Sequence, residues 1–106
     1  MILDRKAALE RIEQDLKLYE EICEIFRDDA PTILIDLKKS LNDRDIPAAT
    51  RHAHSLKSVA ANIGASDLCE SAKLAENSFR AGDIKNSHTM ISNIEQNLLL
   101  VLEALK

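Results

Sequence analysis

Apolar residues recur every three or four positions through most of the chain, the spacing that places them on one face of an α-helix. These stripes, together with residues that cap helix ends, predict five helical segments. The first opens at Asp4 and directs Ala8 and Ile12 toward a core. Asp15 opens a longer second segment, whose expected buried stripe is Leu18, Ile22, Ile25, Phe26, Ile33, Leu34, Leu37 and Leu41.

Pro31 falls inside this second stripe. A proline removes one backbone hydrogen bond from a helix, so either the helix kinks there or a new helix begins with Pro31 in its first turn. Because the stripe continues in phase across Pro31, we favour a single helix with a kink, which ends before the break at residues 42–45.

The rest of the chain predicts three more helices, each with its own apolar face. The residues expected at their ends are Asp45 with Pro47 and Gly64 for the third, Ser66 and Gly82 for the fourth, and Asp83 at the start of the fifth. The faces expected in the core are Ala49, Ala53, Leu56, Ala60 and Ile63, then Leu68, Ala72, Ala75 and Phe79, and finally Ile84, Ile91, Ile94, Leu98, Val101, Leu102 and Leu105.

Short connections between long amphipathic helices place neighbouring helices antiparallel. We therefore expect an all-α fold: an antiparallel up-down four-helix bundle with a short additional N-terminal helix, forming a single domain over residues 1–106. The composition agrees, because only 2 Gly, 2 Pro and 3% aromatic residues are present, which excludes a turn-rich sandwich or barrel.

The charge balance bears on partners and location. Lys and Arg number 14 against 18 Asp and Glu, so an acidic chain without long basic stretches is not expected to bind nucleic acid. Its longest aliphatic run, residues 98–102, is too short to cross a bilayer, and the N-terminus lacks the order of a secretory signal. We expect a cytoplasmic protein with no membrane partner, in which Cys23 and Cys69 stay reduced.

His54 lies at the rim of the third helix's apolar face, about 100° around the axis from Ala53. Arg51 lies about one turn before it and Lys57 one turn after it on the same rim, and Ser58 is small. Such neighbours leave the imidazole open to a partner, and a cation at that distance could neutralise an anion on the ring.

The run RHAHSLKSVAANIGA at residues 51–65 resembles the signature of histidine-containing phosphotransfer (HPt) domains, which is typically Ala-His-x-Leu-Lys-Gly followed by a Gly-Ala pair. Two further stretches resemble the family's neighbouring helices. They are Leu18-Tyr19-Glu20-Glu21 with Phe26, Ala30 and Pro31, and the ending Glu76, Arg80, Ala81-Gly82-Asp83. The resemblance covers nearly the whole chain in the right order.

The resemblance implies that His54 accepts the phosphoryl group and that Lys57 is the cation on the phosphate side. Ser58 stands where the family usually has the glycine that keeps the histidine accessible, and Gly64 ends the active helix. Glu76 stands where some members present an amide. Its carboxylate either accepts the proton of the unreactive ring nitrogen or is simply surface charge, and Arg51 and Arg80 are either solvated or within reach of a docking face.

A phosphorelay intermediate of two-component signalling follows from the resemblance. It would carry phosphohistidine between receiver domains of response regulators or hybrid histidine kinases, as a monomer. The chain is not expected to be a kinase, because Gly64 and Gly82 both sit at helix ends and no Gly-rich phosphate loop is present. We expect no cofactor of its own, with Mg²⁺ in the receiver. The alternative is a small helical adaptor that binds a protein without phosphotransfer.

The other histidines predict no chemistry. His52 lies about 160° around the helix from His54 and is expected at or near the surface. His88, between Ile84 and Ile91, is expected at the edge of the core. A zinc site is not expected from these histidines and Cys23 and Cys69, because the paired spacing of zinc ligands is absent.

Overall fold

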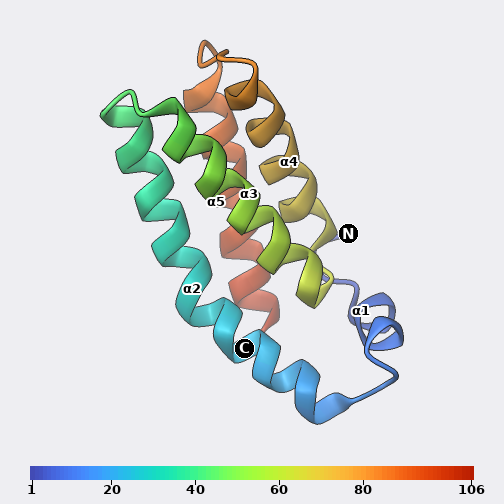
Figure 1. The fold of residues 1–106 in the computed structure, drawn as a ribbon. Coiled ribbons are helices and arrows are strands. Elements are labelled where there is room, and N and C mark those ends of the chain that lie inside the picture. Colours follow the sequence, from blue (N-terminus) through green and yellow to red (C-terminus); the bar gives the residue numbers. More distant parts are fainter.

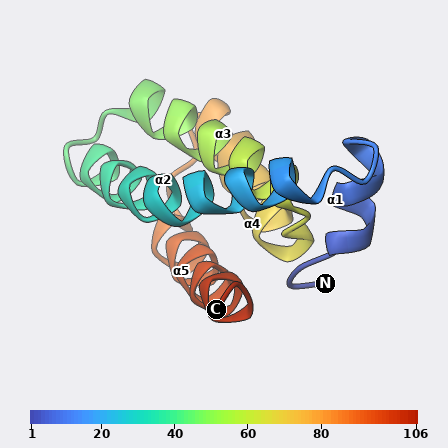
Figure 2. The same cartoon turned by 90° about the horizontal axis from the view of Figure 1, so that it is seen from below.

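A computed structural model describes residues 1–106 as five helices with no strand (Figure 1). The helices are α1 (Arg5–Arg11), α2 (Leu16–Asn42), α3 (Ile46–Ile63), α4 (Ser66–Arg80) and α5 (Ser87–Ala104). Helices α2 to α5 run alternately up and down, and α1 lies beside the turn between α3 and α4 (Figures 1 and 2). The predicted all-α bundle with a short N-terminal helix is confirmed.

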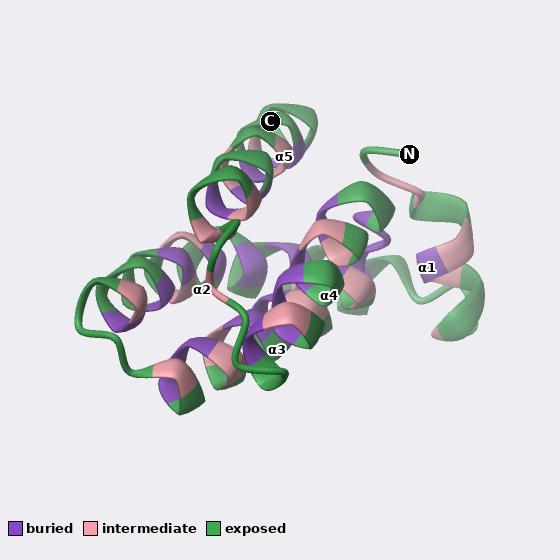
Figure 3. Ribbon diagram, turned by 90° about the horizontal axis from the view of Figure 1, so that it is seen from above, coloured by how far each residue is buried: buried purple, intermediate pink, exposed green.

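The core is a single cluster of 22 buried residues, drawn from all five helices and the α3–α4 turn. Figure 3 shows the buried positions as stripes along the helices, with exposed positions on their outer sides. The largest apolar side chains that are fully enclosed are Phe26, Phe79, Leu37, Leu56, Ile63, Leu68, Ile94 and Val101. Removal of this apolar surface from water is the main term that holds the helices together.

Helix α2 continues through Pro31 without a break, as the unbroken phase of its stripe predicted. Its buried face differs in part from the prediction, because Leu18 and Ile25 are exposed. The prediction was wrong for these two residues. Phe26, Leu34 and Leu37 are buried as predicted, and Ile22, Ile33 and Leu41 are half-buried against the core. The residues that face the core are Tyr19, Cys23, Phe26, Ala30, Leu34 and Leu37.

Helix α3 begins and ends where the sequence indicated. The Asp45 carboxylate accepts a hydrogen bond from the Ala48 N–H at 3.1 Å, and Pro47 occupies the first turn. Gly64 ends the helix in the left-handed conformation, with φ of 82°. All five residues of the predicted seam are buried, so the rotation of α3 about its axis was predicted correctly.

Two predicted helix starts were wrong. Ser66 is the first residue of α4 rather than its cap; Ala65 precedes the helix, and no side chain caps it. Helix α5 starts at Ser87 with Asn86 as its cap, three residues after the expected cap Asp83, because the Asp83 carboxylate accepts a hydrogen bond from the Lys85 N–H within the loop. Such a local bond competes with helix formation. The predicted faces are otherwise buried, except that Ile84 and Leu102 are half-buried.

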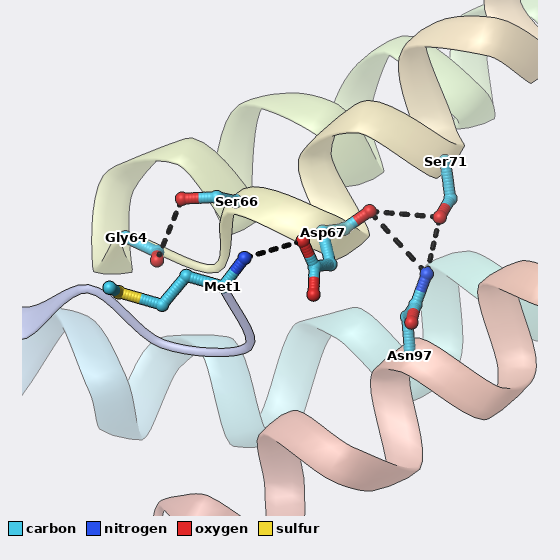
Figure 4. Close-up of polar contacts among 6 residues, drawn as sticks. All are labelled: Met1, Gly64, Ser66, Asp67, Ser71 and Asn97. Carbon is cyan, nitrogen blue, oxygen red and sulfur yellow. Dashed lines mark hydrogen bonds and ion pairs between the residues drawn. The ribbon is translucent and has the colours of Figure 1, made fainter.

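The N-terminal segment ties α1 to the α3–α4 turn. The Asp4 N–H donates to the Gly64 carbonyl at 2.7 Å, and the Asp4 carboxylate caps α1 by accepting from the Ala7 N–H. The Met1 amino group forms an ion pair with Asp67 at 2.6 Å (Figure 4). In the same view the Asn97 amide donates to the Ser71 hydroxyl and to the Asp67 carbonyl, which joins α5 to α4.

None of the five helices combines the length and apolar character needed to cross a lipid bilayer. Cys23 is buried, Cys69 is half-buried, and both are free thiols, as expected.

Candidate functional site

His54 projects from the middle of α3, where the helix leaves the core and meets solvent. Its neighbours Ala53 and Leu56 are fully buried, whereas 55% of the His54 side chain is exposed. The packing of the seam therefore fixes the rotation of α3 and holds the imidazole at the surface without burying it.

Glu76 on α4 is the partner of this ring, and it is almost completely buried. One carboxylate oxygen, Oε2, lies 2.9 Å from His54 Nδ1 and also accepts a hydrogen bond from the Arg80 guanidinium. The other oxygen, Oε1, lies 2.7 Å from the Lys57 ammonium, an ion pair whose angle is not that of a hydrogen bond. The interpretation of Glu76 as surface charge was wrong. The structure instead contains the other alternative, in which the Glu76 carboxylate contacts the unreactive nitrogen of the His54 ring.

The charge of Glu76 is set by these contacts. Burial alone raises the pKa of the Glu76 carboxyl, but the contacts with Lys57, His54 and Arg80 outweigh burial and lower this pKa to about 2. The carboxylate is consequently ionised at neutral pH and can only accept hydrogen bonds.

An ionised Glu76 fixes the tautomer of His54. Because the carboxylate carries no proton, the 2.9 Å contact requires a hydrogen on Nδ1, and the neutral ring then has its free lone pair on Nε2. Nε2 makes no hydrogen bond within the protein. The arrangement therefore presents an exposed nitrogen nucleophile, with two cations, Lys57 and Arg80, held beside the ring by the same carboxylate.

The other predicted site residues take lesser positions. Arg51 and Ser58 are exposed on α3 and make no side-chain hydrogen bond or ion pair, and Gly64 lies at the end of the helix. Arg80 was left open between solvent and the docking face, and the structure brings it to Glu76. Its position four residues after Glu76 on one helix is the signal from which this pair could have been found.

The remaining histidines lie away from this site. His52 is half-buried, as expected. The expectation for His88 was wrong: it is exposed in the first turn of α5, because the late start of that helix leaves it outside the core. No group of three or more His, Cys, Asp or Glu side chains is arranged to hold a metal ion.

Comparison with known families identifies the kind of domain that carries this exposed histidine. Residues 21–106 match the model of the Hpt domain family. The chain belongs to the Hpt domain family. Hpt domains are phosphocarriers rather than kinases, and they interact with receiver domains of two-component systems. This protein is accordingly a phosphotransfer intermediate of a phosphorelay.

A solved structure supports the same assignment over more of the chain. The crystal structure of histidine-containing phosphotransfer protein B (HptB) from Pseudomonas aeruginosa PAO1 is similar, with a TM-score of 0.89 and 26% sequence identity. The match covers 97% of this chain and 90% of that protein, so it includes α1 as well as the four-helix bundle. No curated protein matches this sequence significantly.

Proposed function

We propose that His54 accepts a phosphoryl group from the aspartyl phosphate of one receiver domain and passes it to the aspartate of another. The observation that carries this proposal is the exposed His54 ring whose Nδ1 lies 2.9 Å from the buried carboxylate of Glu76. That pairing leaves Nε2 unprotonated on a largely exposed side chain, which is the state a nucleophilic imidazole requires.

Transfer to His54 then needs no separate base, because no proton has to leave the ring. The Nε2 lone pair forms a bond to phosphorus, the bond between phosphorus and the aspartyl oxygen breaks, and the aspartate leaves as a carboxylate. The ring becomes a cation that keeps its proton on Nδ1. Onward transfer reverses these steps at a second receiver, and the neutral imidazole is restored.

The residues around His54 have distinct parts in this proposal. Lys57 and Arg80 supply positive charge beside the ring for the phosphoryl oxygens. Ser58, one turn along α3, is small enough to leave the ring uncovered, and Gly64 ends this helix. Arg51, exposed one turn before His54, would face a docked receiver. The Mg²⁺ that the reaction uses would belong to the receiver.

Incubation with phosphorylated receiver domains tests the proposal. We expect acid-labile label to appear on the protein and to be lost in a His54→Gln variant that keeps its helical content. His52→Gln, two residues away on the same helix, is the matched control and should still be labelled. Binding of the receiver without label would instead support the adaptor, and label on any residue other than His54 would refute the site assignment.

A further inference from the structure

Glu76 does more than choose a tautomer, because it is the only acid in contact with the His54 ring. The charged groups in contact with it are Lys57, from the same helix as His54, and Arg80, from α4. No acid or base of α2 or α5 forms an ion pair with any of these residues. The electrostatics of the ring are therefore governed by one carboxylate and the two cations that it holds.

Phosphorylation of His54 changes the charge of the ring that contacts the Glu76 carboxylate. When Nε2 carries phosphorus and Nδ1 keeps its hydrogen, the ring is positively charged. In the unphosphorylated protein the Glu76 oxygen already lies 2.9 Å from Nδ1. A buried opposite charge at this separation favours the charged form of its neighbour. The same relation holds in hydrolases, where a carboxylate stabilises the imidazolium that forms during the reaction.

Resting on the proposed function, we infer that Glu76 shortens the lifetime of the phosphoryl group on His54 by keeping Nδ1 protonated on the phosphorylated ring. When the bond between Nε2 and phosphorus breaks, its electron pair returns to Nε2, and a neutral imidazole leaves. The phosphoryl group passes to the oxygen of a receiver carboxylate or of water. If Nδ1 had lost its proton, the leaving group would be an anionic imidazolate, which leaves much less readily.

The carboxylate shortens the lifetime in a second way, through the cations. Glu76 engages both Lys57 and Arg80, so less of their charge is available to hold a phosphoryl group on the ring. A glutamine at this position could still accept the hydrogen bond from Nδ1, but it would neither stabilise the positive ring nor neutralise the charge of the two cations. Both changes act in the same direction, toward a longer-lived phosphohistidine.

The experiment compares the parent protein with Glu76→Gln and with Glu70→Gln, a matched control that removes one exposed charge from the same helix. Each protein is phosphorylated with a receiver domain or with potassium phosphoramidate and then purified. Loss of the phosphoryl group is followed by ³¹P NMR across a pH series. We expect Glu76→Gln to keep it about tenfold longer at mildly alkaline pH, with the inflection of its pH profile moved down by about one unit. Glu70→Gln should behave as the parent.

Equal lifetimes and equal pH profiles for the parent and Glu76→Gln would overturn the inference. A second measurement avoids the variant altogether: ¹⁵N NMR should show Nδ1 of phosphorylated His54 protonated to a higher pH in the folded protein than in the same protein unfolded in urea. Equal values would also overturn it. If the parent takes up no phosphoryl group on His54 from either donor, the proposed function fails as well, whereas normal labelling with unchanged lifetimes removes only the role of Glu76.

Discussion

The Lys57 ammonium lies 2.7 Å from Oε1 of Glu76, so the cation expected to serve the phosphoryl group is already paired in the unphosphorylated protein. The Lys57 side chain is 29% exposed, and its carboxylate partner is buried. The pair thus holds the lysine beside His54 in advance, which lowers the entropy lost when its charge is needed. The same carboxylate competes with the phosphoryl group for that charge, so the contribution of Lys57 to the transfer rate is limited.

Lys57→Ala should slow phosphoryl transfer to His54 by about ten- to a hundredfold without abolishing it, since a charge-assisted contact is worth about 1 to 3 kcal/mol. The nucleophile itself is unchanged. Lys57→Arg should recover part of the rate, because the charge is kept although its geometry differs. Rapid-quench kinetics with a phosphorylated receiver measure the three rates.

Receiver affinity is measured separately, so that a docking defect is not read as a chemical one. Lys39→Ala is the matched control: it removes an exposed cation from α2 that forms no ion pair and has no part in the proposed site or docking face. If Lys57→Ala binds the receiver normally and transfers at the parental rate, Lys57 is an ordinary surface lysine.

The parts of this site that could be predicted are those set by local sequence. Capping by Asp45, the left-handed Gly64 and the spacing of the α3 seam together fix which way His54 faces, and each is readable along the chain. The position of Glu76 is different. An acid beside Ala75 looks like the solvated edge of α4, and only the rotation of α4 against α3 brings it under His54.

The same reason explains the errors outside the site. In α2 several apolar residues crowd the first turns, and periodicity alone does not decide between a face through Leu18 and one through Tyr19. The Tyr19 hydroxyl donates to the Ile63 carbonyl at 2.8 Å, a contact between residues 44 positions apart, and this pairing selects the buried face. Contacts between helices, rather than helix propensity, determine which face of α2 is buried, which the apolar spacing alone did not decide.

Gly64→Ala should destabilise the fold strongly. A Cβ at Gly64 would come 2.2 Å from the Asp4 carbonyl oxygen, and the φ of +82° is strained for any residue with a side chain. We expect a loss of more than about 2 kcal/mol, combining backbone strain with displacement of the N-terminal segment. Urea denaturation measures the change.

Gly82→Ala separates these two causes. Gly82 has a similar φ of +77°, but a Cβ there meets nothing within 4 Å. Its cost should be that of the left-handed backbone alone, about 1 kcal/mol. Equal losses for the two variants would show that the contact between Gly64 and Asp4 does not restrain α1.

Acid should remove the stabilisation that Glu76 provides. Its pKa in the folded protein is lowered from 4.5 to about 2, because the contacts with the three basic groups outweigh burial. A depressed pKa means that this stability is fully present above pH 4.5 and is lost as the pH falls toward about 2. Its size is at most about 3 kcal/mol, since His54 and Arg80 are largely exposed and screened by solvent.

Urea denaturation at a series of pH values, for the parent and Glu76→Gln, measures this dependence. The difference in unfolding free energy between the two proteins should shrink as the pH falls through the window from 4.5 to about 2. Glu70→Gln, which changes an exposed acid on the same helix, should differ from the parent by a constant amount. If unfolding free energy varied with pH in the same way for the parent and for Glu76→Gln, the ion pairs of the buried Glu76 carboxylate would be contradicted.

Tyr19 offers a spectroscopic test of the buried face of α2, because it is the only tyrosine and the chain has no tryptophan. Burial, with the nearby Cys23 thiol adding to it, raises the pKa of the Tyr19 phenol from 10.0 to about 12. The near-ultraviolet absorbance of tyrosinate should therefore appear near pH 12 in the folded protein and near pH 10.0 in urea.

The same shift fixes the alkaline limit of stability. A raised pKa means that the stabilisation is complete below pH 10.0 and is lost as the pH rises to about 12, since the unfolded chain ionises first. Tyr19→Phe should remove this alkaline dependence, and it should cost about 1 to 3 kcal/mol at neutral pH by leaving the Ile63 carbonyl without its 2.8 Å donor. If Tyr19 titrated near 10.0 in the folded protein, its hydroxyl would be in water, and the buried face of α2 would have to pass through Leu18 instead.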